Sequence, residues 1–488
     1  MVSLSVTSTP LLIGGEEREA SDSFAVYDPS NRELIGYAAA ASTAEAEDAV
    51  RAAHEAWPAW AALSTAERVR LALASLEGLD SDADERAELL VRENGKTRME
   101  ATIDPLVLVG RFHHAAAVAA AVEDEETLSG PPFATTIAHV PVGVVTIIFP
   151  FNWPLAILGA SLPYALMAGN TVVVKPPPTT PISVVRTLRH LALALPPGVL
   201  NVVTGADPVV GPVVVGDPRV KHVCFTGSVG AGRQIMQAAA PNLTRVTLEL
   251  GGNDPAVVLH DAAFDEAEIE RLAAATFMTT GQVCMAIKRL YVPRGRFDEV
   301  VSGLESALAR TVVGSGLDPD VTMGPLHSER QRDFVVELVS EARTAGAEVR
   351  EAGTFACDPD SGHYLLPSLV LDPGRELRVV AEEQFGPTLP VIPYDDEAEA
   401  VALANDTWSG LCSSVWSTDE EHALSVARQL RTGVTFINNH NATAVDERAP
   451  FGGFNQSGIG REMGREGLLE FTETHVMSAP RPDPDASH

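Results

Sequence analysis

Short β-rich runs alternate with helical segments through the first half of this 488-residue chain. The apolar runs lie at 142–149, 171–174, 200–203, 222–225 and 246–250, and helical stretches separate them at 155–167, at 183–195 and from about residue 231. Alternation of this kind is typical of a parallel sheet with helices on both faces. The pattern predicts a doubly wound α/β fold, in which ligands bind at the carboxyl ends of the strands.

A second α/β series follows in the C-terminal half. Helical stretches lie at 265–279, 296–310 and 327–345, and strand-like runs lie at 289–292, 365–371, 389–393 and 412–416. A chain of this length is expected to form more than one domain. We predict a dinucleotide-binding domain from 1–122 and 143–250, a second domain from 251–462, and an arm and tail from 123–142 and 463–488, of which residues 480–488 form an exposed end.

Charge and cysteine content exclude several classes of function. The chain has 66 acidic and 35 basic residues, for a net charge of −31, and binding nucleic acid would require clustered Lys and Arg. The four cysteines, Cys224, Cys284, Cys357 and Cys412, lie far apart without a CxxC pair. We therefore predict no disulfide framework and no metal site, in a reducing cytoplasm.

One stretch could be mistaken for a membrane segment. Residues 127–174 contain no Lys, Arg, Asp or Glu, but several prolines, Asn152 and the pair Gly169–Asn170 interrupt them. Short buried strands joined by turns explain the stretch better than a membrane helix does. The N-terminus also lacks the pattern of a signal peptide, so we expect a soluble protein without a membrane partner.

Three residues are the leading candidates for chemistry. Cys284 stands in the segment GQVC, and Glu249 ends a β-branched run that leads into the pair Gly251–Gly252. A thiol and a carboxylate in such settings suggest a nucleophile and a base that serve one carbonyl reaction. Asn152 is framed by prolines and aromatics, and a rigid amide is what an oxyanion donor requires.

Cofactor binding has weaker signals. The turn at 225–232 follows a strand and opens a helix, where backbone N–H groups can hold a pyrophosphate, although its spacing is not the usual G-x-G-x-x-G. Lys175 leaves a buried strand at the edge where ligands bind, yet a solvated lysine at a strand end would look the same. Taken singly, Asn152 could satisfy a turn, Glu249 could cap a backbone and Cys284 could be a structural thiol.

Taken together, these segments resemble the NAD(P)-dependent aldehyde dehydrogenase superfamily over about residues 10–478. The matching segments, in order, are FPFNWP, VVVKP, FTGS, ELGG, GQVC, EEQFGP and PFGGFNQSGIGRE. The resemblance implies that Cys284 attacks the aldehyde, that Asn152 and the Cys284 N–H hold the oxyanion, and that Glu249 activates the water that releases the acid. We expect a basic, water-excluding site near bound cofactor to favour the Cys284 thiolate.

The resemblance also implies the cofactor site and its residues. Lys175 and Glu383 would bind the two riboses, Phe385 would pack at the nicotinamide end, and the full set is Phe149, Pro150, Lys175, Gly227, Ser228, Leu250, Gly251, Glu383 and Phe385. Many relatives that favour NAD carry a glutamate where this chain has Pro178. We therefore expect NAD as cofactor, with NADP tolerated.

Three further positions depart from the family pattern. Ser161 stands where many members have a lysine that relays protons with the later glutamate, here Glu462, so that relay is in doubt. Asn455 replaces a frequent lysine, and Ala160 replaces a bulky aromatic, which suggests a roomier tunnel. The expected tunnel walls are Phe151, Trp153, Ile157, Ala160, Val283, Met285, Val445 and Phe451. Ordinary packing in the protein core would give the same apolar residues.

Substrate and assembly follow from the same resemblance. The 150–180 stretch is most similar to bacterial aromatic-aldehyde (benzaldehyde-type) dehydrogenases, so we expect aromatic or medium-chain aliphatic aldehydes rather than succinate semialdehyde. The arm at 123–142 and the C-terminal segment would form a homodimer or homotetramer. A CoA-acylating enzyme, or a non-catalytic scaffold that keeps the fold, remains an alternative, and Glu249 argues against the former.

Overall fold

The structure is a computed structural model, and it describes residues 7–130 and 132–481. An eight-stranded sheet has the order β22-β12-β11-β8-β9-β10-β2-β3, and its five central strands, from β12 to β10, run parallel. The strands are β2 (Leu11–Ile13), β3 (Glu16–Arg18), β8 (Val144–Ile148), β9 (Thr171–Lys175), β10 (Leu200–Val202), β11 (Val220–Thr226), β12 (Arg245–Glu249) and β22 (Gly458–Ile459). The predicted doubly wound parallel sheet is confirmed.

Helices cover both faces of this sheet. They are α1 (Thr43–Ala61), α2 (Thr65–Ala74), α3 (Ala83–Asn94), α4 (Arg98–Val118), α5 (Pro154–Met167), α6 (Ile182–Ala194), α7 (Asp207–Gly216) and α8 (Val229–Ala239). Along β9, Val172 and Val174 pack with α5 and α6, whereas Val173 packs with α1 and α7 on the other face. Because both faces are buried, these strands read in the sequence as unbroken apolar runs.

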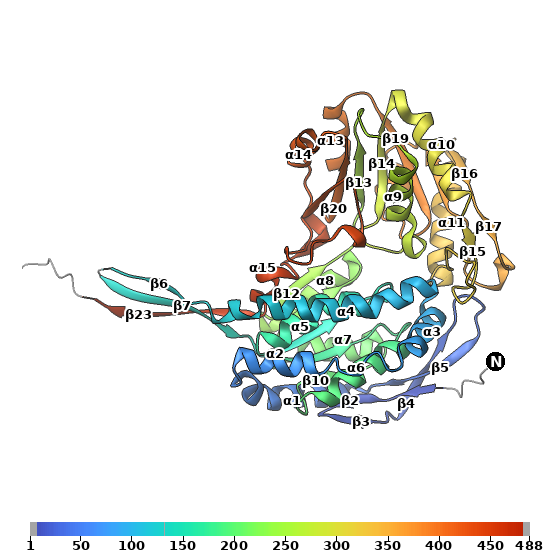
Figure 1. Ribbon diagram of the computed structural model, residues 1–488. Helices are drawn as coiled ribbons and strands as arrows, with labels where there is room; N and C mark the ends of the chain where they lie inside the picture. Colours follow the sequence, from blue (N-terminus) through green and yellow to red (C-terminus); the bar gives the residue numbers. More distant parts are fainter. Residues whose placement is uncertain (1–6, 131, 482–488) are drawn as a thin grey trace, which may run out of the picture.

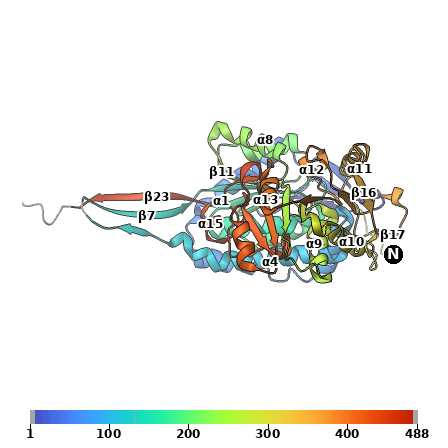
Figure 2. The same ribbon diagram turned by 90° about the horizontal axis from the view of Figure 1, so that it is seen from above.

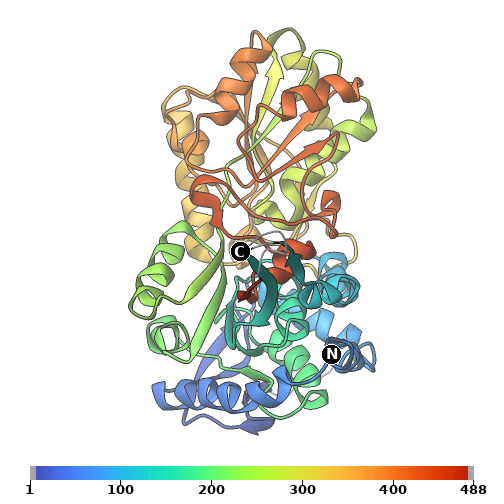
Figure 3. The same cartoon turned by 90° about the vertical axis from the view of Figure 1, so that its left-hand side faces the viewer.

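A second, seven-stranded sheet has the order β16-β18-β19-β14-β13-β20-β21. Its strands are β13 (Asp254–Val258), β14 (Ile287–Pro293), β16 (Glu348–Glu351), β18 (Ser368–Leu371), β19 (Thr388–Tyr394), β20 (Cys412–Trp416) and β21 (Val434–Ile437), and its helices are α9 (Glu266–Phe277), α10 (Phe297–Leu308), α11 (Glu329–Thr344), α12 (Arg378–Ala381), α13 (Glu397–Asn405) and α14 (Glu420–Ala427). The two sheets form two lobes, one above the other (Figure 3). Central strand β13 was not expected, because Asp254 and Pro255 at its start obscure a short apolar run.

Smaller elements complete the fold. They are β1 (Thr7–Thr9), β4 (Asp22–Tyr27) and β5 (Leu34–Ala40) in one sheet, β15 (Val312–Val313) with β17 (Thr354–Phe355), and α15 (Gly464–Leu469) near the chain end. The segment Arg98–Glu123, which includes α4, is the one described helical stretch long and apolar enough to cross a membrane, and α4 packs against α5.

A three-stranded arm projects from the lobes (Figures 1 and 2). It consists of β6 (Glu126–Leu128), β7 (Phe133–Pro141) and β23 (Thr472–Pro480), with β23 antiparallel to β7. Leu128, Phe133 and Val476 leave large apolar side chains exposed on it. The exposed end predicted at 480–488 lies, beyond Arg481, outside the described residues.

Candidate active site

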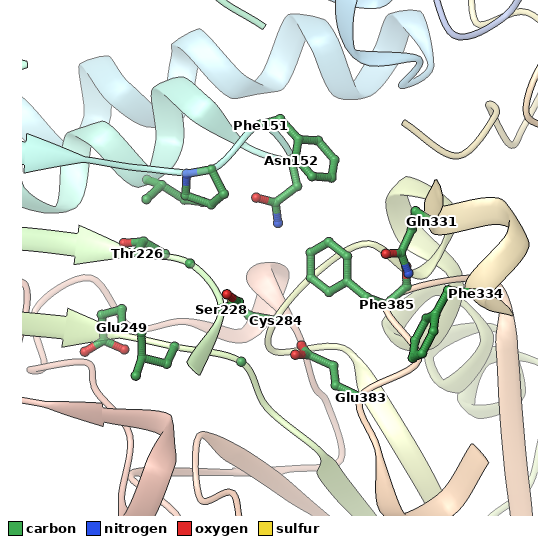
Figure 4. A pocket seen from close by; sticks show the side chains of 15 residues that line it. Phe151, Asn152, Thr226, Ser228, Glu249, Cys284, Gln331, Phe334, Glu383 and Phe385 are labelled. Atoms are coloured by element: carbon green, nitrogen blue, oxygen red, sulfur yellow. The ribbon is translucent and has the colours of Figure 1, made fainter. Parts of the chain in front are cut away.

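A cavity of about 280 Å³ contains most of the residues predicted for catalysis and cofactor binding (Figure 4). Its floor is the edge where the parallel strands of the first sheet end, and its other wall comes from the second lobe. The lining residues are Pro150, Phe151, Asn152, Ile157, Thr226, Gly227, Ser228, Glu249, Leu250, Gly251, Cys284, Gln331, Phe334, Glu383 and Phe385. This is the strand edge at which the sequence placed a ligand.

The predicted oxyanion donor is rigidly held beside the nucleophile loop. Asn152 is 2% exposed, and its side-chain amide donates to the Gln282 carbonyl at 2.9 Å, two residues before Cys284. An NH₂ group has two N–H bonds, so one remains to donate elsewhere. Asn94 donates to the Phe151 carbonyl and fixes the segment from behind. This arrangement fits a preorganised donor to a negative oxygen on a carbon bound to Cys284.

Glu249 is a buried carboxylate at the last position of β12. It is 4% exposed, and neither of its oxygens has a hydrogen-bond partner among the described residues. Burial raises its pKa well above the ordinary value, nearby Glu462 raises it further, and Arg461 lowers it. Figure 4 shows the carboxylate on the strand side of the cavity, set back from Cys284. A carboxylate with a raised pKa is a better proton acceptor from water than an ordinary one.

Glu462, the predicted relay residue, is hydrogen-bonded to Ser161. The Ser161 hydroxyl donates to Glu462 at 2.6 Å in a buried setting. Burial raises the pKa of Glu462, and the Ser161 hydrogen bond and Arg111 oppose this rise. A neutral hydroxyl thus stands where a charged lysine was the family expectation, and both the carboxylate of Glu462 and the guanidinium of Arg461 act on Glu249.

The expectation of a basic site around Cys284 is wrong. Burial raises the pKa of the thiol to about 12, and the carboxylates Glu383, Asp254 and Glu249 raise it in turn, whereas only Lys288 lowers it. The sequence could not show this, because these carboxylates come from separate strands and loops. The residues around Cys284 therefore favour its protonated thiol over the thiolate.

This charge pattern predicts the pH dependence of thiol alkylation. We expect iodoacetamide to modify Cys284 of the cofactor-free protein at a rate that rises with pH from 7 to 10, because the thiolate fraction keeps growing below a raised pKa. The modified peptide can be quantified by mass spectrometry, with the partly exposed Cys357 as internal reference. A Cys284 rate that levels off below pH 8 would contradict the prediction.

The predicted cofactor residues separate into two groups. Pro150, Gly227, Ser228, Leu250, Gly251, Glu383 and Phe385 line the cavity, whereas Phe149 is buried and Lys175 forms an ion pair with Asp207 at the start of α7. Ser228 caps α8 and accepts a hydrogen bond from Ala231 N–H, so the helix N-terminus opens toward the cavity. A side chain on Gly251 would collide with the carboxylate of Glu383. The start of α8, with Gly227 and Ser228 in the cavity, fits a pyrophosphate.

Of the predicted tunnel residues, Phe151 and Ile157 line the cavity with Cys284, whereas the other six pack in apolar clusters near it. Trp153, Ile157, Val283 and Met285 share one apolar cluster, and Ala160, Val445 and Phe451 belong to the core against which Cys284 packs. Phe151 forms a cavity wall, stacks on His327 at 3.7 Å and meets Phe385 edge-on at 6.2 Å. Trp153 is largely covered and donates to Thr279 at 3.0 Å, so it also supports the nucleophile loop.

Several residues at or near the site had not been identified from sequence. Gln331 and Phe334 of α11 line the cavity. Arg111 of α4 lies close to the predicted tunnel residues. Its Nε donates to Glu447 at 2.9 Å, and its Nη1 donates to the Ala156 carbonyl at 2.6 Å. No local motif marks these residues, because their position depends on packing between distant segments.

Comparison with known proteins identifies the family and the fold of this chain. Residues 16–477 match the model of the aldehyde dehydrogenase family. A 3-succinoylsemialdehyde-pyridine dehydrogenase from a Pseudomonas species is 35% identical over 93% of this chain and 94% of its own length. The crystal structure of a Staphylococcus aureus betaine aldehyde dehydrogenase mutant with NAD⁺ superposes with a TM-score of 0.92 at 30% identity, covering 98% of both chains. An Escherichia coli NADP-dependent enzyme gives 0.92 at 32% identity, covering 97% of this chain and 98% of that one.

This chain belongs to the aldehyde dehydrogenase family, whose enzymes oxidise aldehydes with NAD(P). The relatives are named for different aldehyde substrates. The comparisons therefore confirm the aldehyde dehydrogenase family, but not the expected benzaldehyde-type group within it.

Proposed function

We propose that this protein oxidises an aromatic or medium-chain aliphatic aldehyde to its carboxylic acid through a thioester on Cys284. The observation that supports this most strongly is that Cys284, Asn152 and Glu249, which are far apart in the sequence, line one cavity. A nucleophile, an oxyanion donor and a base are the groups that such a reaction requires.

The roles of the side chains follow from their chemistry. The Cys284 thiol loses its proton to solvent and its sulfur attacks the aldehyde carbon, and Asn152 with the Cys284 N–H holds the resulting oxyanion. NAD, held by residues such as Gly227, Ser228 and Glu383, would supply the hydride acceptor, and loss of hydride from the tetrahedral carbon would leave a thioester on Cys284. Glu249 then takes a proton from water, whose oxygen attacks the thioester carbon, and the acid departs while the sulfur regains its proton.

Asp207 supports a preference for NAD over NADP. The position after Lys175 that often carries a glutamate is Pro178, but the Asp207 carboxylate contacts Lys175 from the start of α7 and is 71% exposed. A carboxylate beside the proposed ribose ligand can accept from a ribose hydroxyl and repels a 2′-phosphate. Asp207 would thus replace the missing glutamate from another part of the chain.

Replacing Asp207 by asparagine tests this assignment. We expect D207N to bind 2′-phospho-AMP about tenfold more tightly relative to AMP, because one close charge repulsion is worth roughly 1.4 kcal/mol. Calorimetric titration of both nucleotides measures the ratio without turnover, and E266Q on the exposed start of α9 serves as control. An unchanged ratio would remove Asp207 from cofactor selection.

The apolar side chains around Cys284 support the proposed substrate class. The guanidinium of Arg111, the arginine found near the predicted walls, is occupied by Glu447 and a backbone carbonyl. A distal carboxylate on a substrate would have to displace Glu447, whereas an aromatic ring or alkyl chain meets apolar walls. A panel of benzaldehyde, hexanal and succinate semialdehyde tests this, and highest kcat/KM for succinate semialdehyde would overturn it.

Glu249 also supports hydrolysis over CoA acylation. Its base function would deliver water to the thioester, in competition with a thiol acceptor. We expect acid formation to proceed without CoA and to yield no acyl-CoA when CoA is added. Binding of NAD without turnover of any aldehyde in the panel would instead favour the scaffold alternative.

We also propose a separate function for each of three parts of the chain. We assign cofactor binding to 1–122 and 143–250, catalysis to 251–462, and assembly to 123–142 with the C-terminal segment. The exposed apolar side chains of the arm support assembly into a homodimer or homotetramer. The four free cysteines support a reducing compartment such as the cytoplasm.

A further inference from the structure

Lys288 is a buried cation that the catalytic scheme leaves without a role. It lies on β14, four residues after Cys284, and is 2% exposed. Its ammonium donates to the carbonyls of Gly281 at 3.0 Å and Val283 at 2.9 Å. Lys96 and Lys175 are also buried, and each pairs with an aspartate. Lys288 forms no ion pair within the described ranges, so backbone carbonyls of the nucleophile loop hold its charge.

The loop that Lys288 holds is strained. Thr279, Thr280 and Gly281 have φ values of 52°, 59° and 71°, the left-handed region that non-glycine residues rarely adopt. Each such threonine costs on the order of 1 kcal/mol, so neighbouring contacts must fix the conformation. Glu100 accepts from the Thr279 N–H at 2.6 Å at the start of the loop. Lys288 fixes its end, where the chain turns to present Cys284.

The surroundings of Lys288 are rich in carboxylates. Burial lowers its pKa, and Glu383, Asp254 and the Cys284 thiol raise it. Burial raises the pKa of Glu383 to about 7 and that of Asp254 well above its ordinary value, and Lys288 lowers both.

Other charged or titratable groups near this cluster do not replace Lys288. Arg289 is occupied by the Asn253, Leu403 and Ala404 carbonyls and the Tyr291 hydroxyl. His440 lies 3.9 Å from Asp254, and burial lowers its pKa to about 3, so it is neutral. Glu249 adds a further carboxylate on the Cys284 side. Lys288 is therefore the cation shared by the nucleophile and its acidic neighbours.

We propose that Lys288 is a positioning residue for the nucleophile: its ammonium clamps the strained loop and supplies the positive charge that favours the Cys284 thiolate. The clamp orients the Cys284 N–H toward the oxyanion, and the charge offsets the surrounding carboxylates. This inference deepens the proposed function, because it concerns the same cysteine.

Alkylation of Cys284 in the cofactor-free protein tests Lys288 apart from turnover. We expect Cys284 of K288M to react with iodoacetamide about tenfold more slowly than that of wild type at each pH between 7 and 10. Loss of the positive charge should raise the pKa of the thiol by about one unit, which lowers the thiolate fraction about tenfold. K288Q, which keeps an amide donor for the carbonyls, should show the same slowing without loss of the loop contacts. K288R, which keeps the charge, should stay within about threefold of wild type.

Two comparisons separate this role from a general loss of structure. The exposed Lys221 gives the control variant K221M, and the Cys357 alkylation rate reports on the fold of each variant. If K288M does not fold, K288Q carries the test. Cys284 rates in K288Q equal to wild type at every pH would overturn the proposal. Because this readout needs no aldehyde, it can fail while the enzyme still turns over, or hold when no aldehyde is oxidised.

Discussion

Replacing Cys284 by serine is expected to abolish aldehyde-dependent NADH formation, with kcat/KM reduced at least about a thousandfold. A serine hydroxyl is far harder to ionise than a thiol, and the carboxylates around this position would oppose its ionisation further. The loss should appear as absent absorbance growth at 340 nm with aldehyde and NAD.

The matched control is C357S. Cys357 is partly exposed and lies outside the cavity, so its replacement should leave turnover within about twofold, as is usual for a surface change. NAD binding by C284S, followed by calorimetry, should stay close to wild type. Undiminished turnover in C284S would end the proposal of covalent catalysis at this residue.

Replacing Glu249 by glutamine is expected to separate the two halves of the reaction. Hydride transfer does not need a base for water, so the first turnover should still produce a burst of NADH. Steady-state turnover should then fall about 10²- to 10⁴-fold, the range for loss of a general base. Rapid-mixing absorbance at 340 nm distinguishes the burst from the slow phase.

The comparison variant for this base is E462Q. Glu462 is bound to Ser161 instead of a lysine, so we expect E462Q to slow turnover much less than E249Q does. Steady-state turnover in E249Q equal to wild type would remove Glu249 as the base. A larger effect of E462Q would transfer that role to Glu462.

The sequence was sufficient for the elements whose pattern is local. Strands such as β9 and β11 are buried on both faces and read as continuous apolar runs, and the residues just after them must meet at one sheet edge. Cys284, Glu249 and Asn152 also stand in short motifs that occur in this chain in the same order as in the family it resembles. The parallel sheet and the three candidate catalytic residues could therefore be inferred from the sequence alone.

Features that depend on packing between distant segments could not be inferred. Asp207 at the start of α7 contacts Lys175 at the end of β9, and Arg111 binds Glu447, which lies more than 300 residues away in the sequence. The acidic surroundings of Cys284 come from Asp254 and Glu383 on separate elements. Lys288 lies four residues after Cys284 in the sequence. Its hydrogen bonds to the loop carbonyls, however, depend on the turn that Thr279 and Thr280 form with their left-handed backbone conformation.

The central claim is a thioester on Cys284 that water resolves with help from Glu249. Its most direct measurement is the mass of the Cys284 peptide from E249Q, quenched in acid after one NADH per subunit has formed with an aldehyde. We predict that this peptide carries the acyl group of the aldehyde, and that the adduct disappears slowly as the acid is released. A full burst of NADH with unmodified Cys284, or with the acyl group on another residue, would contradict the account.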